Sequence, residues 1–408
     1  MNGSVRRVAI TGMGAVSAFG EGAHVLWQGL RSGASAIRPL RHERAADVRV
    51  RVAAQVPESF DPTAHFDERT LPLLDRTAQF ALLAAREAVA QSGMAWDSDA
   101  AKRRAAVVIG TGVGGENTQN EQARRLYADN ATRLNPLTIV RVMPNAPASQ
   151  VSIAYGLRGP AFGVVSACAS SNHAIAQAAL LIRAGLADVA IAGGTEACFT
   201  YGALRAWEAM RVLADDTCRP FSANRRGLVL GEGAGVFVLE AMEHAQARGA
   251  VLLAELAGLG MSADAGDIVA PDPAGAAAAM AQALDDAGLA PGDVDYVNAH
   301  GTGTLANDPG ETRAIRQVFG PHADRLAVSS TKSMHGHALG ASGALELVGV
   351  LGALREGVVP PTANFTTPDP ACDLDYVPNT AREMPVRAAL SNSFAFGGLN
   401  AVLALKRA

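Results

Sequence analysis

The sequence has few aromatic residues and few cysteines. Its 408 residues include 3 tryptophans, 5 tyrosines and 4 cysteines, against 42 glycines. So low an aromatic content argues against an aromatic-rich β-sandwich, whereas abundant glycine is typical of tight turns between strands and helices. The cysteines lie far apart with no CxxC spacing, which fits neither a zinc site nor a disulfide framework. We therefore expect a reduced α/β protein, and we predict no catalytic metal.

The chain also lacks an excess of basic charge and any long unbroken apolar segment. A formal net charge of −4 leaves no polybasic stripe, which argues against nucleic acid as a partner. The apolar stretch after Cys168 is interrupted by Arg183 and Asp188, and the segment from Met1 to Arg7 leaves no room for the apolar core of a signal peptide. We expect a cytoplasmic protein with no membrane insertion.

What the sequence does contain is a regular alternation of apolar runs and helical patterns. After Cys168, apolar residues recur at the i, i+3, i+4, i+7 spacing of a helix with one buried face, from Ile175 to Ile182. The runs that we interpret as strands in the first half are Val8 to Ile10, Ala105 to Ile109, Gly163 to Ala167 and Val189 to Ala192. This alternation predicts an α/β fold.

The second half of the chain echoes the first. Val8 to Gly14 resembles Ala254 to Gly260, and Val108 to Gly112 resembles Asn298 to Gly303. We interpret this as a duplicated α/β unit, with an N-terminal half over residues 1–250 and a C-terminal half over residues 251–408. Chance similarity between short strings of apolar residues and glycine is the alternative.

Cys168 occupies the position expected of a nucleophile. An apolar run ends at this thiol, and small residues then open a helix. Because a helix N-terminus carries partial positive charge, we expect a lowered thiol pKa there. The alternative for any free cysteine is an inert core thiol, and we keep that interpretation for Cys198, Cys218 and Cys372.

Two histidines stand where they can meet this thiol. His300 and His337 follow the strand-like runs Val294 to Asn298 and Leu326 to Ser329, and each lies in a glycine-flanked loop. Residues just beyond the carboxyl ends of strands normally face a ligand crevice. We therefore expect Cys168, His300 and His337 to converge at one edge of the sheet, where the later half provides both histidines.

At this point the sequence resembles the elongating β-ketoacyl-acyl-carrier-protein synthases, which belong to the thiolase superfamily and use a Cys-His-His triad. The resemblance implies a five-layer αβαβα fold with internal duplication and a homodimer, while a heterodimer with a related subunit stays open. The segments that carry it are Gly156 to Pro160, Ala167 to Ser170, Ala192 to Glu196, Gly231 to Gly235, Asn298 to Thr304, Ser330 to Met334, Gly336 to Glu346 and Asn392 to Asn400.

The resemblance implies a decarboxylative Claisen condensation. Cys168 would attack an acyl thioester on acyl carrier protein, while the backbone N–H groups of Cys168 and Phe396 hold the oxyanion. Neutral His300 and His337 would then stabilise the enolate formed when malonyl-acyl carrier protein loses carbon dioxide. The product is a 3-oxoacyl thioester two carbons longer. No free cofactor is expected, because phosphopantetheine is carried by the acyl carrier protein.

Further roles come from the same resemblance. Lys332 matches a structural and electrostatic lysine, with Glu311 as its expected salt-bridge partner, and Glu346 would organise the active-site network. Thr302 and Thr304 would bind the pantetheine arm. We assign the substrate-binding, carrier-docking and cation-binding roles as follows: Phe394, Val113 and Thr138 contact substrate; Arg211 and Arg133 dock the carrier protein; Asn298, Glu346, Ser391 and Asn392 surround a cation.

Some positions depart from the common pattern of this family. The segment from Asp264 to Val269 lacks the His and Thr usual at the pantetheine entrance, and Val113 is smaller than the usual Ile. With Thr138 in place of a bulky Phe, these departures favour a long or unusually shaped acyl tunnel. We therefore favour a specialised synthase for nodulation-type or polyene-type acyl chains over a housekeeping fatty-acid enzyme.

Other classes of protein compete with this interpretation. A non-catalytic partner of the chain-length-factor type would lack the nucleophile, whereas Cys168 and both histidines are present. A thiolase would need a second catalytic cysteine where this chain has Phe396, and a starter-type synthase would have Asn in place of His337.

Overall fold

Ten principal strands join in one hydrogen-bonded path, to which each half of the chain contributes five. The computed structural model describes residues 5–408. The prediction that the chain has no signal peptide rests partly on Met1 to Ser4, which lie outside the described residues. The strands of the first set are β1 (Val8–Ser17), β5 (Ala105–Gly110), β6 (Ala161–Val164), β7 (Val189–Glu196) and β8 (Gly233–Ala241). The strands of the second set are β9 (Ala254–Ala263), β10 (Tyr296–Asn298), β11 (Ala327–Ser329), β14 (Ala388–Ala395) and β15 (Leu399–Lys406).

The two sets share one topology. The first runs in the order β6-β5-β7-β8-β1 and the second in the order β11-β10-β14-β15-β9, which is the same order when each set is numbered along the chain. In both, the first three strands of that order are parallel and the remaining pairs are antiparallel. The sets join where Val8 to Ile10 of β1 pairs with β9. The predicted duplication is confirmed, and the boundary at residue 250 stays a prediction.

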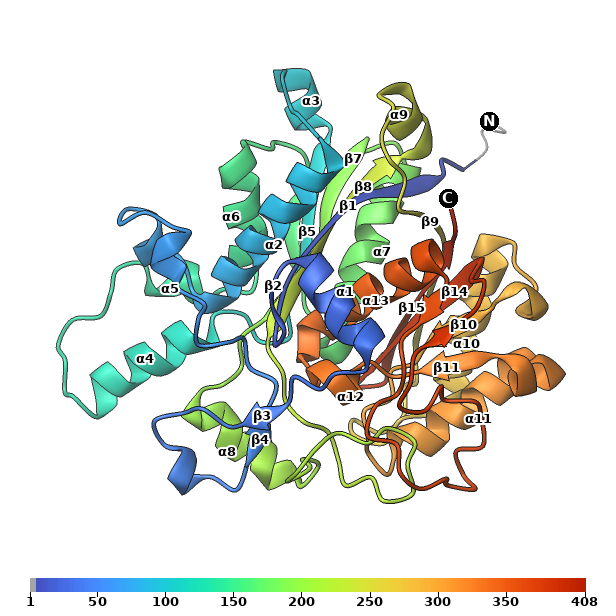
Figure 1. Cartoon of the computed structure of the whole chain (residues 1–408). Helices are drawn as coiled ribbons and strands as arrows, with labels where there is room; N and C mark the ends of the chain where they lie inside the picture. Colours follow the sequence, from blue (N-terminus) through green and yellow to red (C-terminus); the bar gives the residue numbers. More distant parts are fainter. Residues whose placement is uncertain (1–4) are drawn as a thin grey trace.

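The helices form three layers around these strands. Helices α7 and α13 pack between the two sets, α2 and α6 cover the outer face of the first set, and α10 and α11 cover the outer face of the second (Figure 1). The helices are α1 (Ala23–Ser32), α2 (Arg76–Ser92), α3 (Asp99–Arg103), α4 (Glu116–Tyr127), α5 (Thr138–Val142), α6 (Ala146–Tyr155), α7 (Ser170–Arg183), α8 (Tyr201–Met210), α9 (Met242–Ala247), α10 (Pro273–Ala287), α11 (Asn307–Phe319), α12 (Lys332–His335) and α13 (Ser342–Glu356). This arrangement is the five-layer αβαβα fold.

Paired glycines explain why the two halves echo each other in sequence. A Cβ atom at Gly12 or Gly14 of β1 would lie 2.1 Å from a backbone oxygen of α2. The same atom at Gly258 or Gly260 of β9 would lie 2.1 or 1.9 Å from a backbone oxygen of α10. Only glycine permits so close an approach of helix backbone to strand. The repeated glycines are therefore required by the same close packing of strand against helix in both halves.

Short elements and loops complete the structure. The short strands are β2 (Gly20–Glu21), β3 (Arg38–Pro39), β4 (Val52–Ala53), β12 (Val358–Val359) and β13 (Arg382–Glu383). All four cysteines are free and buried, as expected. Within residues 5–408, no helix combines the length and the apolar character needed to cross a membrane.

The contact between α1 and α13 leaves no space for an added methyl group. A Cβ atom at Gly352 would lie 2.4 Å from ring atoms of Trp27, whereas a Cβ atom at Gly202 of α8 would meet nothing within 4 Å. We expect Gly352→Ala to lower the free energy of unfolding by about 1–3 kcal/mol through overpacking. The matched Gly202→Ala should leave it unchanged or raise it by up to about 1 kcal/mol. Denaturant unfolding followed by circular dichroism measures both, and equal effects would contradict the packing described.

Candidate active site

Cys168 lies at a sharp turn between β6 and α7. The strand ends at Val164, a 3₁₀ turn spans Ala167–Ala169, and α7 begins at Ser170. Ala167 has a φ of 48°, a left-handed conformation that is strained for a residue with a side chain. Ser170 holds the turn, since its Oγ accepts from the N–H of Ser166 at 2.9 Å and donates to the carbonyl of Ala167 at 2.7 Å. The thiol thus lies in the 3₁₀ turn that directly precedes the α-helix.

The expected low pKa of this thiol is wrong. Burial raises the pKa of Cys168 to about 12, and the positive charge of Lys332 opposes this only in part. Cys168 is 5% exposed, and removing a thiolate from water outweighs the modest field of a helix terminus. The free protein therefore holds a neutral thiol.

His337 contacts the thiol directly. Its Nε2 lies 3.1 Å from Cys168 Sγ, and its Nδ1 lies 2.7 Å from the Oγ of Ser342, the first residue of α13. Its backbone is also fixed, because its N–H donates to the carbonyl of Val229 at 2.6 Å. Sequence reasoning missed Ser342, although a serine at a helix start five residues after a candidate histidine was a usable signal.

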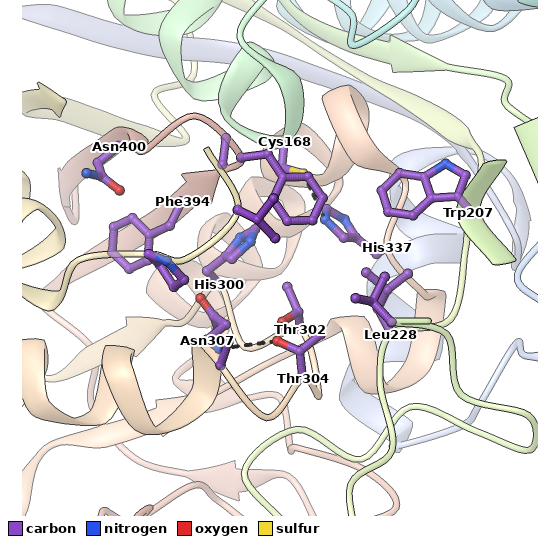
Figure 2. A pocket seen from close by; sticks show the side chains of 16 residues that line it. Cys168, Trp207, Leu228, His300, Thr302, Thr304, Asn307, His337, Phe394 and Asn400 are labelled. Carbon is purple, nitrogen blue, oxygen red and sulfur yellow. Dashed lines mark hydrogen bonds between the residues drawn. The ribbon is translucent and has the colours of Figure 1, made fainter. Parts of the chain in front are cut away.

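His300 completes the group from the other side. Its ring centroid lies 5.4 Å from that of His337, and the two planes meet at 85°. Burial and the charge of Lys332 hold the pKa of both imidazoles well below the usual range, so both are neutral. Figure 2 shows Cys168, His300 and His337 gathered at one pocket. The structure thus brings together the three groups singled out in the sequence.

The salt-bridge partner of Lys332 is Glu346, and the expected pairing with Glu311 is wrong. The side chains of Lys332 and Glu346 are fully buried and in direct contact. Lys332 Nζ also donates to the carbonyl of His300 at 2.6 Å and lies 3.4 Å from its Nδ1.

Glu311 serves the backbone instead of the lysine. It accepts from the N–H groups of His300 and Gly301 at 2.8 and 2.7 Å, and from the side-chain amide of Asn392 at 3.2 Å. The Glu311 carboxylate is therefore occupied by the loop that contains His300 and Gly301, and it holds that loop in place.

Four buried side-chain oxygens of the second half lack hydrogen-bond partners, and one of them belongs to Glu346 of this ion pair. They are Asn298 Oδ1, Glu346 Oε2, Ser391 Oγ and Asn392 Oδ1. Leaving such atoms unpaired away from water is costly, and a set made of oxygens alone suits a hard cation. The residues fit the cation that the family resemblance implies. Within residues 5–408, no cluster of three or more His, Cys, Asp or Glu side chains is arranged to hold a metal.

The three groups face a mainly apolar cavity of about 110 Å³. Thr302 and Thr304 lie on one side of it, with their hydroxyls 2.8 Å apart. Among the other lining residues, the Phe396 ring stacks on Trp207 with centroids 6.2 Å apart, and Phe394 packs near His300. Trp207 and Leu228 were not anticipated, because they lie on α8 and on a loop without any motif.

The remaining candidates lie outside this cavity. Val113 is 47% exposed in the loop after β5, and Thr138 begins α5; neither lines the cavity in a single chain. Arg211 is exposed at the end of α8, next to the cavity-lining Val212. Arg133 is exposed between α4 and α5.

The neutral thiol has a measurable consequence. Because only the thiolate reacts with alkylating agents, modification of Cys168 by iodoacetamide in the absence of substrate should rise about tenfold per pH unit between about pH 7 and pH 9. The rate is measured by mass spectrometry of the Cys168 peptide, with glutathione as the reference thiol. A plateau below about pH 8 would show that the thiol is ionised near neutrality and would contradict the effect of burial.

Comparison with known proteins identifies the family. Residues 5–245 match the family model "Beta-ketoacyl synthase, N-terminal domain", and residues 253–366 match "Beta-ketoacyl synthase, C-terminal domain". The chain is 52% identical to nodulation protein E of Rhizobium sp. (strain N33), over 98% of this chain and 99% of the relative. It is 43% identical to 3-oxoacyl-[acyl-carrier-protein] synthase 2 of Coxiella burnetii (strain RSA 493 / Nine Mile phase I), over 98% and 99% of the two chains.

A solved structure agrees with this. The ishigamide ketosynthase/chain length factor superposes with a TM-score of 0.94 at 36% identity, covering 99% of this chain and 100% of that one. Sequence, fold and the arrangement around Cys168 thus point the same way, and the chain belongs to the beta-ketoacyl synthase family.

Proposed function

We propose that this protein elongates acyl chains by decarboxylative condensation. An acyl group held on Cys168 would react with malonyl-acyl carrier protein to give 3-oxoacyl-acyl carrier protein and carbon dioxide. The observation that carries the proposal is the 3.1 Å contact between Cys168 Sγ and His337 Nε2, with His300 facing the same cavity. A thiol, a base and a second imidazole in one buried pocket are what acyl transfer followed by enolate formation requires.

In the acylation step, the neutral pair of Cys168 and His337 exchanges a proton during attack. Sγ bonds to the thioester carbonyl carbon while its proton passes to His337 Nε2, and the Ser342 hydroxyl accepts from Nδ1–H. The backbone N–H groups of Cys168 and Phe396 stabilise the oxyanion. When the carrier thiol leaves, it takes the proton from Nε2, and His337 is neutral again.

In the condensation step, both imidazoles act as donors. Lys332 has only donors, so the Nδ1 of His300 is the acceptor in their 3.4 Å contact, and Nε2 of His300 carries the hydrogen. The acylation step leaves the His337 hydrogen on Nδ1. If the ring then loses that proton to solvent and takes one up at Nε2, the Ser342 hydroxyl rotates to donate to Nδ1, and Nε2 becomes a donor. The two N–H groups stabilise the enolate oxygen that develops as the malonyl C–C bond breaks. The enolate carbon then attacks the acyl carbon on Cys168. The thiolate leaves and takes up a proton from solvent, which restores the neutral thiol.

The buried polar groups behind the histidines support these donors. Lys332 fixes His300 through its ring nitrogen and carbonyl, and Glu346 balances the ammonium charge. Asn298, Ser391, Asn392 and Glu346 would hold a cation, which would supply positive charge beside the Glu346 carboxylate.

The acyl carrier protein is the partner that delivers both substrates. Thr302 and Thr304 line the cavity next to Cys168 and would contact the pantetheine thread, so no free cofactor is needed. Arg211 and Arg133 would meet the acidic carrier surface. The name of the Coxiella relative includes the acyl carrier protein, which supports this partner.

Among pathways, specialised acyl synthesis is favoured over bulk fatty-acid synthesis. Identity is 52% to nodulation protein E and 43% to 3-oxoacyl-[acyl-carrier-protein] synthase 2. A non-catalytic subunit is disfavoured, because Cys168, His300 and His337 are all in place. We place the protein in the cytoplasm, consistent with four free cysteines.

The proposed reaction is tested with a panel of acyl-acyl carrier proteins and malonyl-acyl carrier protein, with products identified by mass. The wild-type protein should form 3-oxoacyl products two carbons longer than the primer. Cys168→Ala should abolish acylation yet retain malonyl decarboxylation, whereas His300→Ala should retain acylation and lose decarboxylation by about 100-fold or more. Transacylation by Cys168→Ala would refute the nucleophile, and a wild-type protein inert to every primer would refute the activity.

A homodimer would form through an exposed apolar face on α5, α6 and β6. The edge strand β6 leaves its outer side unpaired in one chain, and α6 and α5 lie next to it. The exposed apolar residues on this face are Ile139, Val140, Met143, Ile153, Phe162 and Val165. Several exposed apolar side chains beside an open sheet edge favour association, and Val113 and Thr138 would border this face.

Light scattering during size exclusion tests this assembly. The wild-type protein should have twice the chain mass of 42.0 kDa. Ile153→Glu on the proposed face should give monomer, because it places a charge in an apolar interface. Val251→Glu is the matched control, since both residues are 71% exposed and Val251 lies in the segment before β9. A wild-type monomer that forms a complex only with a related subunit would favour the heterodimer.

A further inference from the structure

Glu196 is a buried carboxylate that takes no part in the acylation or condensation steps proposed above. It ends β7 and is 1% exposed. One oxygen accepts from the N–H groups of Gly112 and Gly340 at 2.7 and 3.0 Å. The other accepts from the Thr111 hydroxyl at 3.0 Å and from the N–H of Val113 at 3.4 Å. One side chain thus binds two loops that come from different halves of the fold.

The two loops are in close contact at the carboxylate. A Cβ atom at Gly340 would lie 2.3 Å from the backbone nitrogen of Gly112 and 2.8 Å from a Glu196 oxygen, and a Cβ atom at Gly112 would lie 2.7 Å from that oxygen. Only glycine fits at position 340, and a side chain at position 112 would displace the Glu196 carboxylate. The loops approach each other this closely because the carboxylate takes up both N–H groups, which would otherwise be buried without partners.

The same loops also bind the first turn of α7, next to the nucleophile. The Ser170 hydroxyl contacts the carbonyl of Thr111 at 3.1 Å, and the Ser171 hydroxyl donates to the carbonyl of Gly340. Gly340 is therefore held on both sides, by Glu196 at its N–H and by α7 at its carbonyl.

What Glu196 holds bears on His337. Gly340 belongs to the short 3₁₀ turn Leu339–Ala341, which connects the loop of His337 to Ser342. Leu339 has a φ of 46°, so this turn is strained and depends on surrounding bonds to keep its shape. Ser342 in turn contacts His337 Nδ1 at 2.7 Å. A displaced turn would therefore move the group that sets which His337 nitrogen carries the hydrogen.

Glu196 acts as a hydrogen-bond acceptor and not as one member of an ion pair. Within residues 5–408, no Lys, Arg or His side chain forms a salt bridge with it. Burial raises its pKa to about 7, against the opposing effect of its donors. The neutral acid can keep the bonds from the N–H groups of Gly112 and Gly340 on one oxygen while its other oxygen donates its proton to the Thr111 hydroxyl. A glutamine reproduces this arrangement with its amide nitrogen as the donor, and gives up only the 3.4 Å contact with the N–H of Val113.

We propose that Glu196 is a positioning residue for the condensation, which fixes the turn Leu339–Ala341 and, through Ser342, the ring of His337 against the Cys168 thiol. The motif Ala192 to Glu196, which the proposed catalytic groups leave unexplained, thereby gains a role. The inference rests on the proposed condensing activity for its kinetic readout, and on the reactivity of the thiol for a readout that needs no substrate.

The test compares Glu196→Gln, Glu196→Ala and Ser171→Ala. Glu196→Ala should lower kcat for condensation by about tenfold or more while KM for acyl-acyl carrier protein changes less than about threefold, because the reacting groups and not the substrate contacts are displaced. Glu196→Gln should stay within about threefold of the wild-type kcat. Ser171→Ala, which loosens Gly340 from its other side, should show the same kcat-selective loss as Glu196→Ala.

Alkylation of Cys168 by iodoacetamide gives the independent readout. Its rate and pH profile should change in Glu196→Ala and match the wild type in Glu196→Gln. Glu240→Gln is the control for altering a buried carboxylate elsewhere, since Glu240 pairs with Arg248 and His244, and it should leave alkylation unchanged.

Equal defects in Glu196→Ala and Glu196→Gln, or a normal kcat in Glu196→Ala, would overturn the proposal. If Glu196→Ala does not fold, a normal kcat in Ser171→Ala overturns it. A wild-type protein without condensing activity would refute the proposed function, while the alkylation rates would still decide the role of Glu196.

Discussion

The contact between the Cys168 sulfur and the His337 ring depends on both halves of the duplicated fold. The thiol precedes α7 of the first half, and the imidazole precedes α13 of the second; these two helices pack together in the central layer. A 3.1 Å approach between side chains 169 positions apart can persist only if that layer is rigid. Small residues and close backbone contacts around the two helices, such as the contact between Gly112 and Gly340, provide this rigidity.

Burial determines the charge state of the site. The thiol and both imidazoles are neutral because water is excluded, and the buried charge of Lys332 is balanced by Glu346 instead of by solvent. In such surroundings each hydrogen bond has a strong effect on orientation, since an unpaired donor or acceptor is costly. The protons move only when a substrate carbonyl offers a place for the developing negative charge.

Periodicity and motif position were sufficient to predict the duplicated α/β fold and the convergence of Cys168, His300 and His337, because strand ends that meet at one sheet edge follow from topology. The partner of Lys332 could not be predicted, because Glu311 and Glu346 are both acidic residues on nearby helices and only the packed structure shows that backbone N–H groups engage Glu311. The Cys168 pKa was misjudged, since the helix-end field is visible in sequence and the extent of desolvation is not. Val113 and Thr138 lie on an exposed face, so one chain alone does not reveal their role.

The strained turn at Ala167 holds the Cys168 sulfur in a buried position where its thiol stays protonated. Peroxide attacks thiolates, so a thiol that stays protonated until an acyl thioester arrives is oxidised slowly. The thiol thus becomes nucleophilic only as it attacks the incoming thioester, and not in the resting protein. A carbon–carbon bond-forming catalyst built in this way can wait for scarce substrate without being inactivated by the chemistry of its surroundings.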